Sequence, residues 1–162
     1  LEPFAGLVFS MTPGESTSLS GMQHSGVLFG MILAGFAGSA FLGAKAAQLE
    51  RWTIAGCAGS TLALLGMAAA AMYGPGWPLK LNVVLLGFAN GVFAVSAIGL
   101  MMALAGANGG GREGVRMGVW GAAQAIAFGT GGLLGALGID ALRSLTGATD
   151  TAFEIVFVVE AV

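Results

Sequence analysis

Charged residues are scarce in this chain of 162 residues: Asp, Glu, Lys and Arg together make up 9% of it, against about 25% in an average soluble domain. Four stretches carry no charge at all, residues 16–44, 52–79, 81–111 and 117–139. A helix needs about 20 apolar residues to cross a bilayer, and in lipid only a helix or a closed barrel satisfies its own backbone. Because these runs show no period-two alternation, we predict an all-α integral membrane protein.

Other residue types are also rare, and their rarity excludes several functions. The single cysteine, Cys57, rules out an internal disulfide. The net charge of −2 and the lack of a basic run give no reason to expect nucleic acid as a partner. The sequence has no Gly-rich phosphate loop, no His or Cys pairs at metal-ligand spacing and no Gly-x-Ser-x-Gly turn. We therefore predict no enzyme activity, no catalytic residue and no metal site.

Turn and cap signals divide the chain into predicted elements. Thr12, Pro13 and Glu15 form a capping-box pattern, so the first long helix is expected to begin at Pro13. Thr151 and Glu154 repeat the Thr-x-x-Glu spacing and are expected to open the last helix. The predicted order is an outer loop over 1–12, spanning helices over 13–44, 52–73, 79–107 and 114–140, and the start of a further helix over 152–162, all in one bundle.

Basic residues predict the orientation, because short cytoplasmic loops carry an excess of them. Four fall on one side of the predicted helices, namely Lys45, Arg51, Arg112 and Arg116. Lys80 and Arg143 fall on the other side, which also holds residues 1–12, a segment without Lys or Arg. We expect residues 1–12 on the periplasmic side. The last apolar run, over 152–162, is too short to span a bilayer, so we expect a longer parent protein.

Glycine is abundant, with 29 residues, and many lie inside the predicted helices. In lipid, small residues four apart let helix backbones approach closely. The pairs at this spacing are Gly26 and Gly30, Gly35 and Ser39, Gly56 and Ser60, Gly87 and Gly91, and Gly131 and Gly135. They predict tight helix packing; the alternative is that Gly and Ala are simply abundant in a GC-rich genome.

Four polar residues in apolar surroundings are candidates for function. His24, expected at the outer interface, could ligate a metal-centred pigment or bond to a neighbouring helix or water. Glu160, roughly 13 Å along the last helix at 1.5 Å per residue, is expected inside the bilayer, where a carboxylate indicates proton coupling, ligand coordination or a paired structural role. Asn90 and Gln124 are expected to form interhelical hydrogen bonds or to line a cavity.

Three stretches together resemble the PucC/LhaA family. They are Leu1-Glu2-Pro3-Phe4-Ala5-Gly6, Gly87-Phe88-Ala89-Asn90-Gly91-Val92-Phe93 and Gly118-Val119-Trp120-Gly121-Ala122-Ala123-Gln124-Ala125. The residues that carry the resemblance are Glu2, Pro3, Phe4, Gly6, Asn90, Trp120 and Gln124. The resemblance implies a branch of the major facilitator fold, with this chain covering about helices eight to twelve of twelve. It also implies that the first of these helices enters from the periplasm, in agreement with the basic residues.

One loop departs from the pattern of solute carriers in that superfamily. Carriers usually keep an Asp-Arg-x-Gly-Arg-Arg type loop between helices eight and nine, whereas residues 43–51 read Gly-Ala-Lys-Ala-Ala-Gln-Leu-Glu-Arg. The aspartate and the basic cluster are missing. A scaffold that handles a large apolar pigment or antenna subunits is therefore favoured over an ordinary transporter.

The resemblance implies an assembly factor for bacterial light-harvesting complexes in the inner, photosynthetic (intracytoplasmic) membrane. Its expected cofactor is transiently held bacteriochlorophyll, with carotenoid or lipid as further candidates. Its expected partners are the antenna alpha and beta polypeptides, the reaction centre–LH1 complex and membrane lipid. Two alternatives stay open: a secondary transporter of a small solute coupled to protons through Glu160, and a structural subunit of a photosynthetic supercomplex.

Overall fold

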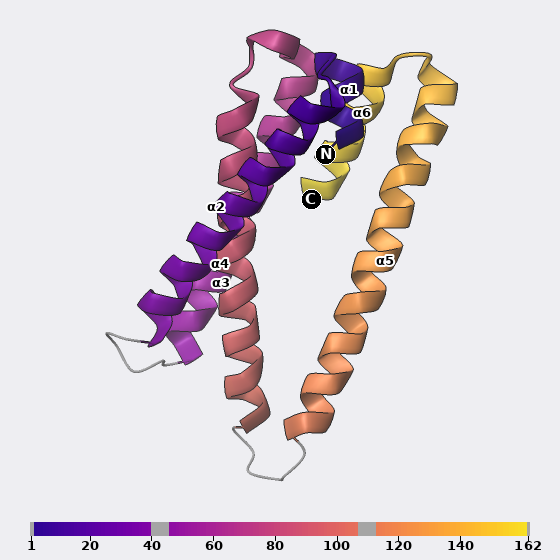
Figure 1. The fold of residues 1–162 in the computed structure, drawn as a ribbon. Helices are drawn as coiled ribbons and strands as arrows, with labels where there is room; N and C mark the ends of the chain where they lie inside the picture. Colours follow the sequence, from indigo (N-terminus) through magenta and orange to yellow (C-terminus); the bar gives the residue numbers. More distant parts are fainter. Residues whose placement is uncertain (1, 40–45, 107–112, 162) are drawn as a thin grey trace.

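The structure, a computed structural model, describes residues 2–39, 46–106 and 113–161, and every regular element in these ranges is a helix (Figure 1). The elements are α1 (Glu2–Phe9), α2 (Pro13–Ser39), α3 (Ala46–Tyr73), the 3-10 turn η1 (Gly74–Gly76), α4 (Leu79–Gly106), α5 (Glu113–Thr146) and α6 (Thr149–Ala161). The prediction of an all-α chain is confirmed for this part of the molecule.

Three of the described segments are long and apolar enough to cross a membrane, namely Gln48–Gly76, Leu79–Leu104 and Gly114–Thr146. They correspond to the spans predicted over 52–73, 79–107 and 114–140. The span predicted over 13–44 corresponds to α2, which is not among them. Glu15, Gln23 and His24 make the first half of α2 polar, and residues 40–44 lie outside the described ranges.

The helix bounds differ from the predicted ones in several places. Residues 2–9 form α1 where a loop was expected, and that expectation was wrong. Pro3 is tolerated because it lies in the first turn, where its missing N–H has no intrahelical partner. The helix is stabilised by burial of Phe4 and Ala5, and it ends where Ser10 takes a φ of 52°. The helix α6 begins at Thr149, three residues before the expected start at residue 152.

The predicted capping box at the start of α2 is confirmed. The Thr12 backbone N–H donates to Glu15 Oε2 at 2.8 Å, and the Glu15 N–H donates to Thr12 Oγ1 at 3.4 Å. The Thr12 hydroxyl also donates to Glu15 Oε2, at 2.8 Å. These bonds satisfy two backbone donors that the first turn of a helix leaves free. They fix the point at which the chain turns from α1 into α2.

The helices α2 and α4 approach each other backbone to backbone. A Cβ atom added to Gly26 or Gly30 of α2, or to Gly87 or Gly91 of α4, would overlap a carbonyl oxygen of the other helix. Those oxygens belong to Val84, Phe88, Gln23 and Val27, in that order. Because the paired residue numbers rise together, the two helices are parallel (Figure 1). We call these four residues the glycine clasp.

The helix α3 packs on another face of α4, in the antiparallel direction, and here polar bonds join the two helices. The Ser60 hydroxyl donates to Asn90 Oδ1 at 2.7 Å, and Asn82 Nδ2 donates to the Ala63 carbonyl at 3.0 Å. Gly56 lies against the α4 backbone without room for a Cβ. Asn90 therefore makes the interhelical hydrogen bond that was one of its two expected roles.

The buried core lies at the end of the bundle that holds α1 and η1, which we call the α1 end. Its residues are Phe4, Ala5, Leu19, Met67, Ala70, Ala71, Leu79, Val83 and Phe153. They come from α1, α2, α3, α4 and α6. The helix α5 supplies none of them and stands apart from α2, α3 and α4 along most of its length, joined at the α1 end to α6 (Figure 1).

We expect Gly30→Ala to destabilise the protein by about 1–3 kcal/mol, because the added methyl group must push two backbones apart. Gly21→Ala, also on α2, is the matched control: nothing lies within 4 Å of a Cβ there, so it should be neutral or slightly stabilising. Thermal unfolding of the purified protein in detergent measures both. Equal melting temperatures for the two variants would contradict the clasp.

Candidate functional site

Phe4 is the centre of an aromatic cluster that joins α1 to α6. Its ring lies edge-on to those of Phe9, Phe153 and Phe157, with centroid distances of 5.5, 5.2 and 5.0 Å. Only 1% of Phe4 is exposed. Edge-to-face pairs at these distances are favourable beyond the area that they bury. The cluster fixes α1 against α6, and thereby builds one wall of the pocket beside it.

That pocket has a volume of about 360 Å³ and lies between α1, α5 and α6. The α5 wall includes three glycines, the α1 wall includes Phe4, and the α6 wall includes Phe157 and Glu160. The full lining is Pro3, Phe4, Leu7, Gly131, Gly132, Gly135, Ala136, Ile139, Asp140, Arg143, Phe153, Val156, Phe157 and Glu160. We call it the α5–α6 pocket. Its α5 wall is flat because glycine has no side chain.

Glu160 lies at the junction of this pocket with a second one of about 340 Å³ on the same helix pair. Gly131, Gly135 and Val156 line both. Apart from Glu160, the lining of the second pocket is apolar. A Cβ on Gly135 would stand 3.2 Å from Glu160 Oε1, so the glycine makes room for the carboxylate. A carboxylate here can accept a hydrogen bond, carry a proton or bind a hard cation such as Mg²⁺.

The lining of the α5–α6 pocket also includes charged residues from the end of α5. Asp140 and Arg143 are both exposed, come from the last turns of α5 and line the pocket. Within the described ranges, no three His, Cys, Asp or Glu side chains come together as a candidate metal site. Two carboxylates, Asp140 and Glu160, line the pocket.

The structure does not bring His24 to this pocket. His24 is exposed on α2, and its Nδ1 lies 2.7 Å from the Ser20 carbonyl of the same helix. If Nδ1 donates that hydrogen bond, the lone pair of the neutral ring is on Nε2, which is the form that binds a metal. His24 therefore faces the surroundings of α2 as a second candidate ligand, separate from Glu160.

Three further residues that carry the family resemblance, Glu2, Pro3 and Gly6, lie in α1. Glu2 accepts a hydrogen bond of 3.4 Å from Ser20 Oγ, and Pro3 lines the α5–α6 pocket. A Cβ on Gly6 would lie 3.9 Å from the Met11 carbonyl, which is an ordinary contact.

Trp120 and Gln124 are half-buried on α5, a helix whose residues are mostly exposed. The Gln124 amide has no hydrogen bond within the described part of the chain, and Gly131 has no neighbour within 4 Å of a Cβ position.

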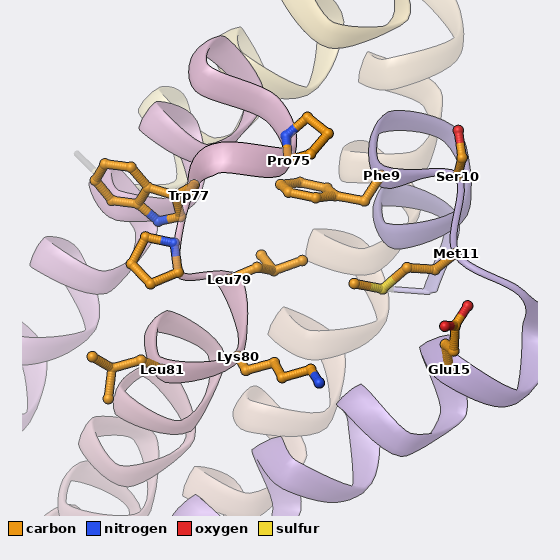
Figure 2. Close-up of a pocket in the computed structure, with 10 residues that line it drawn as sticks. Phe9, Ser10, Met11, Glu15, Pro75, Trp77, Leu79, Lys80 and Leu81 are labelled. Carbon is orange, nitrogen blue, oxygen red and sulfur yellow. The ribbon is translucent and has the colours of Figure 1, made fainter.

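A larger pocket of about 590 Å³ opens at the α1 end, between α1, η1 and the first turns of α2 and α4 (Figure 2). We call it the outer pocket. Its apolar lining includes Phe9, Met11 and Trp77, and its two charged residues are Glu15 and Lys80. The sequence indicated a cap at Glu15. It gave no sign that Glu15 and Lys80, 65 positions apart, would share a pocket.

The fold and the pockets define the class of protein first: a helical membrane protein with an open, apolar, carboxylate-bearing pocket between two helices. The family comparison is more specific, because the family described as PUCC protein matches residues 1–162. The chain belongs to this family.

Curated relatives agree with that assignment. The "Bacteriochlorophyll synthase 44.5 kDa chain" of Rhodobacter capsulatus is 54% identical over 157 residues, which are 97% of this chain and 36% of the relative. "Protein PucC" of the same organism is 28% identical over 99% of this chain and 34% of the relative. "Protein PucC" of Cereibacter sphaeroides is 31% identical over 80% and 26%, respectively. The chain thus spans about a third of these relatives or less. No solved structure matches it significantly.

We expect Phe4→Ala to cost about 3–5 kcal/mol, because it leaves a cavity at the centre of three aromatic contacts. The variant should also expose α1 to limited proteolysis. Leu7→Ala is the matched control on the same helix, since Leu7 is 50% exposed. Thermal unfolding and protease susceptibility check both. A Phe4→Ala protein as stable as the Leu7→Ala protein would show that α1 is not anchored through this ring.

Proposed function

We propose that this chain is part of a non-enzymatic assembly factor for bacterial light-harvesting complexes, which receives bacteriochlorophyll and presents it to antenna alpha and beta polypeptides. Membership of the PUCC family supports this proposal. The printed name of the relative that is 54% identical supplies the link to bacteriochlorophyll. Since the chain spans about a third of the relatives, the proposal concerns a longer protein of which this chain contributes one part.

The α5–α6 pocket is the observation that carries the proposal. A magnesium tetrapyrrole is a flat apolar ring with a hard cation at its centre, and such a cation prefers oxygen ligands. The glycine wall of α5 lets a flat ring approach the helix closely, and Phe4 and Phe157 supply aromatic surface. Glu160 would hold the cation, while Asp140 and Arg143 would meet polar substituents. The residues present therefore fit the pigment.

Exposed helix surface supports a membrane partner. Large apolar side chains are exposed along α5, including Val119, Ile126, Phe128 and Leu133. Small residues alternate with them, which favours close approach of a single-span helix such as an antenna polypeptide. The proposed location is the intracytoplasmic photosynthetic membrane, with the α1 end on the periplasmic side. The reaction centre–LH1 complex is the second proposed partner.

The test compares Glu160→Gln with Glu154→Gln in the full-length protein, gently purified from a pigmented strain. Both variants remove one carboxylate from α6, and Glu154 is not among the residues that line the α5–α6 pocket. We expect wild type and Glu154→Gln to retain absorbing pigment and antenna polypeptides. The Glu160→Gln variant should retain about tenfold less pigment than the wild type, because an amide oxygen is a weaker cation ligand than a carboxylate. A wild-type protein with neither pigment nor antenna partner would overturn the proposal.

A second candidate function, proton-coupled transport of a small solute, is favoured by the same carboxylate, because an intramembrane Glu is a common proton carrier. Glutamine keeps the shape of the side chain but cannot carry the proton. If Glu160→Gln abolishes pH-dependent uptake into vesicles and leaves bound pigment unchanged, transport is the function and pigment delivery is not.

A further inference from the structure

The outer pocket lies at the depth of lipid headgroups. One candidate membrane span ends at Gly76 and the next begins at Leu79. The turn between them, which holds Trp77 and Pro78, must therefore lie at a membrane surface. Tryptophan is favoured at that depth because its ring is apolar and its N–H is polar. Both residues line the outer pocket, so the pocket opens where phospholipid headgroups are concentrated.

The two charges in this pocket act on each other without forming an ion pair. Lys80 extends across the pocket toward the side that holds Glu15 (Figure 2), yet no ion pair within 4 Å joins Lys80 to any acid of the described residues. Glu15 uses Oε2 for both bonds from Thr12, and its Oε1 has no hydrogen bond in the same ranges. The Thr12 backbone N–H, then its hydroxyl, and after them the positive charge of Lys80 lower the pKa of Glu15, so this exposed carboxylate is ionised at neutral pH.

Trp77 contributes its ring to the wall of the pocket. Its indole Nε1 is buried and has no hydrogen-bond partner among the described residues. The rings of Phe9 and Trp77, with Leu79 and Leu81, provide the apolar surface that the glycerol and upper acyl region of a lipid would cover.

We propose that the outer pocket binds the zwitterionic headgroup of a bilayer phospholipid with a primary amine. The headgroup phosphate accepts from Lys80, since a lysine ammonium is a common phosphate ligand. The headgroup amine donates to the free oxygen of Glu15. A cation and an anion that line one pocket without forming an ion pair match a headgroup that carries both charges, whereas an anionic lipid would place its phosphate near Glu15 without compensation. This inference concerns a different site from the proposed pigment pocket and does not depend on it.

The test measures binding of three lipids to the full-length protein by native mass spectrometry and by the lipid-induced shift in melting temperature. The lipids are phosphatidylethanolamine, phosphatidylglycerol and phosphatidylcholine. We expect the ethanolamine lipid to bind about tenfold more tightly than the other two. Lys80→Gln should weaken binding of the ethanolamine lipid about tenfold. Lys80→Arg should retain this binding, because arginine also binds phosphate.

Glu15→Gln is the decisive variant, because glutamine preserves the capping box. This variant should bind the ethanolamine lipid more weakly and bind the glycerol lipid as tightly as the wild type or more tightly. The preference for the ethanolamine lipid is then lost. Asp150→Asn, an exposed acid on α6, is the matched control and should keep the preference. The proposal would be overturned by a preference for the glycerol lipid that depends on Lys80 alone, or by binding of soluble glycerophosphoethanolamine as tightly as the lipid. Equal binding of all three lipids, insensitive to both variants, overturns it as well.

Discussion

Backbone contact between α2 and α4 is the constraint on which the rest of this structure depends. Helices in lipid gain little from the hydrophobic effect when they associate, because acyl chains are as apolar as their side chains. What holds them is close packing, and dispersion forces fade steeply when even a small gap opens. The glycine clasp removes four side chains so that the two backbones can touch. The close packing offsets the free-energy cost of placing glycine inside a helix.

With α2 fixed, α4 becomes the helix that organises its neighbours. Its clasp face is taken by α2, and another face carries Asn82 and Asn90, which bond to α3. The helix α6 then packs on α3, and α1 is held on α6 through Phe4. The helix α5 is last in this order, attached mainly through α6. Within the described residues, the glycines of α5 leave open the space that forms the α5–α6 pocket.

The sequence predicts helices, caps and packing residues more readily than the partners of those residues. The capping box at Thr12 can be predicted because it depends on residues close together in the sequence. A hydrogen bond of Asn90 can be predicted because an amide in an apolar environment needs a partner, but the sequence does not say which partner. Glycines four apart look alike in sequence, yet Gly87 is covered by the α2 backbone while Gly131 has nothing within 4 Å. The difference depends on which helix packs alongside, a contact between residues tens of positions apart.

The same reason explains what sequence reasoning missed. Residues 2–9 look like a loop, because Pro3 and Gly6 weaken the helical signal and the compensating contact of Phe4 lies with Phe153, near the other end of the chain. The outer pocket likewise needs Glu15 and Lys80 to be brought together by the clasp, which sets α2 and α4 side by side in parallel. Neither contact has a local sequence pattern.

The residues that carry the family resemblance separate into two groups by this argument. Phe4 and Asn90 are explained by folding, because they anchor α1 and join α3 to α4. Trp120 and Gln124 are not explained by folding, since the Gln124 amide has no hydrogen bond in the described ranges.

Spacings of four, seven and four residues place Trp120, Gln124, Gly131 and Gly135 on one face of α5. Gly131 and Gly135 on that face line the α5–α6 pocket, and Trp120 and Gln124 lie nearer the start of the helix. A tryptophan ring and a free amide in line with an open glycine wall are suited to contact a flat ligand or a second helix, so the specificity of this part of the protein is to be sought along α5.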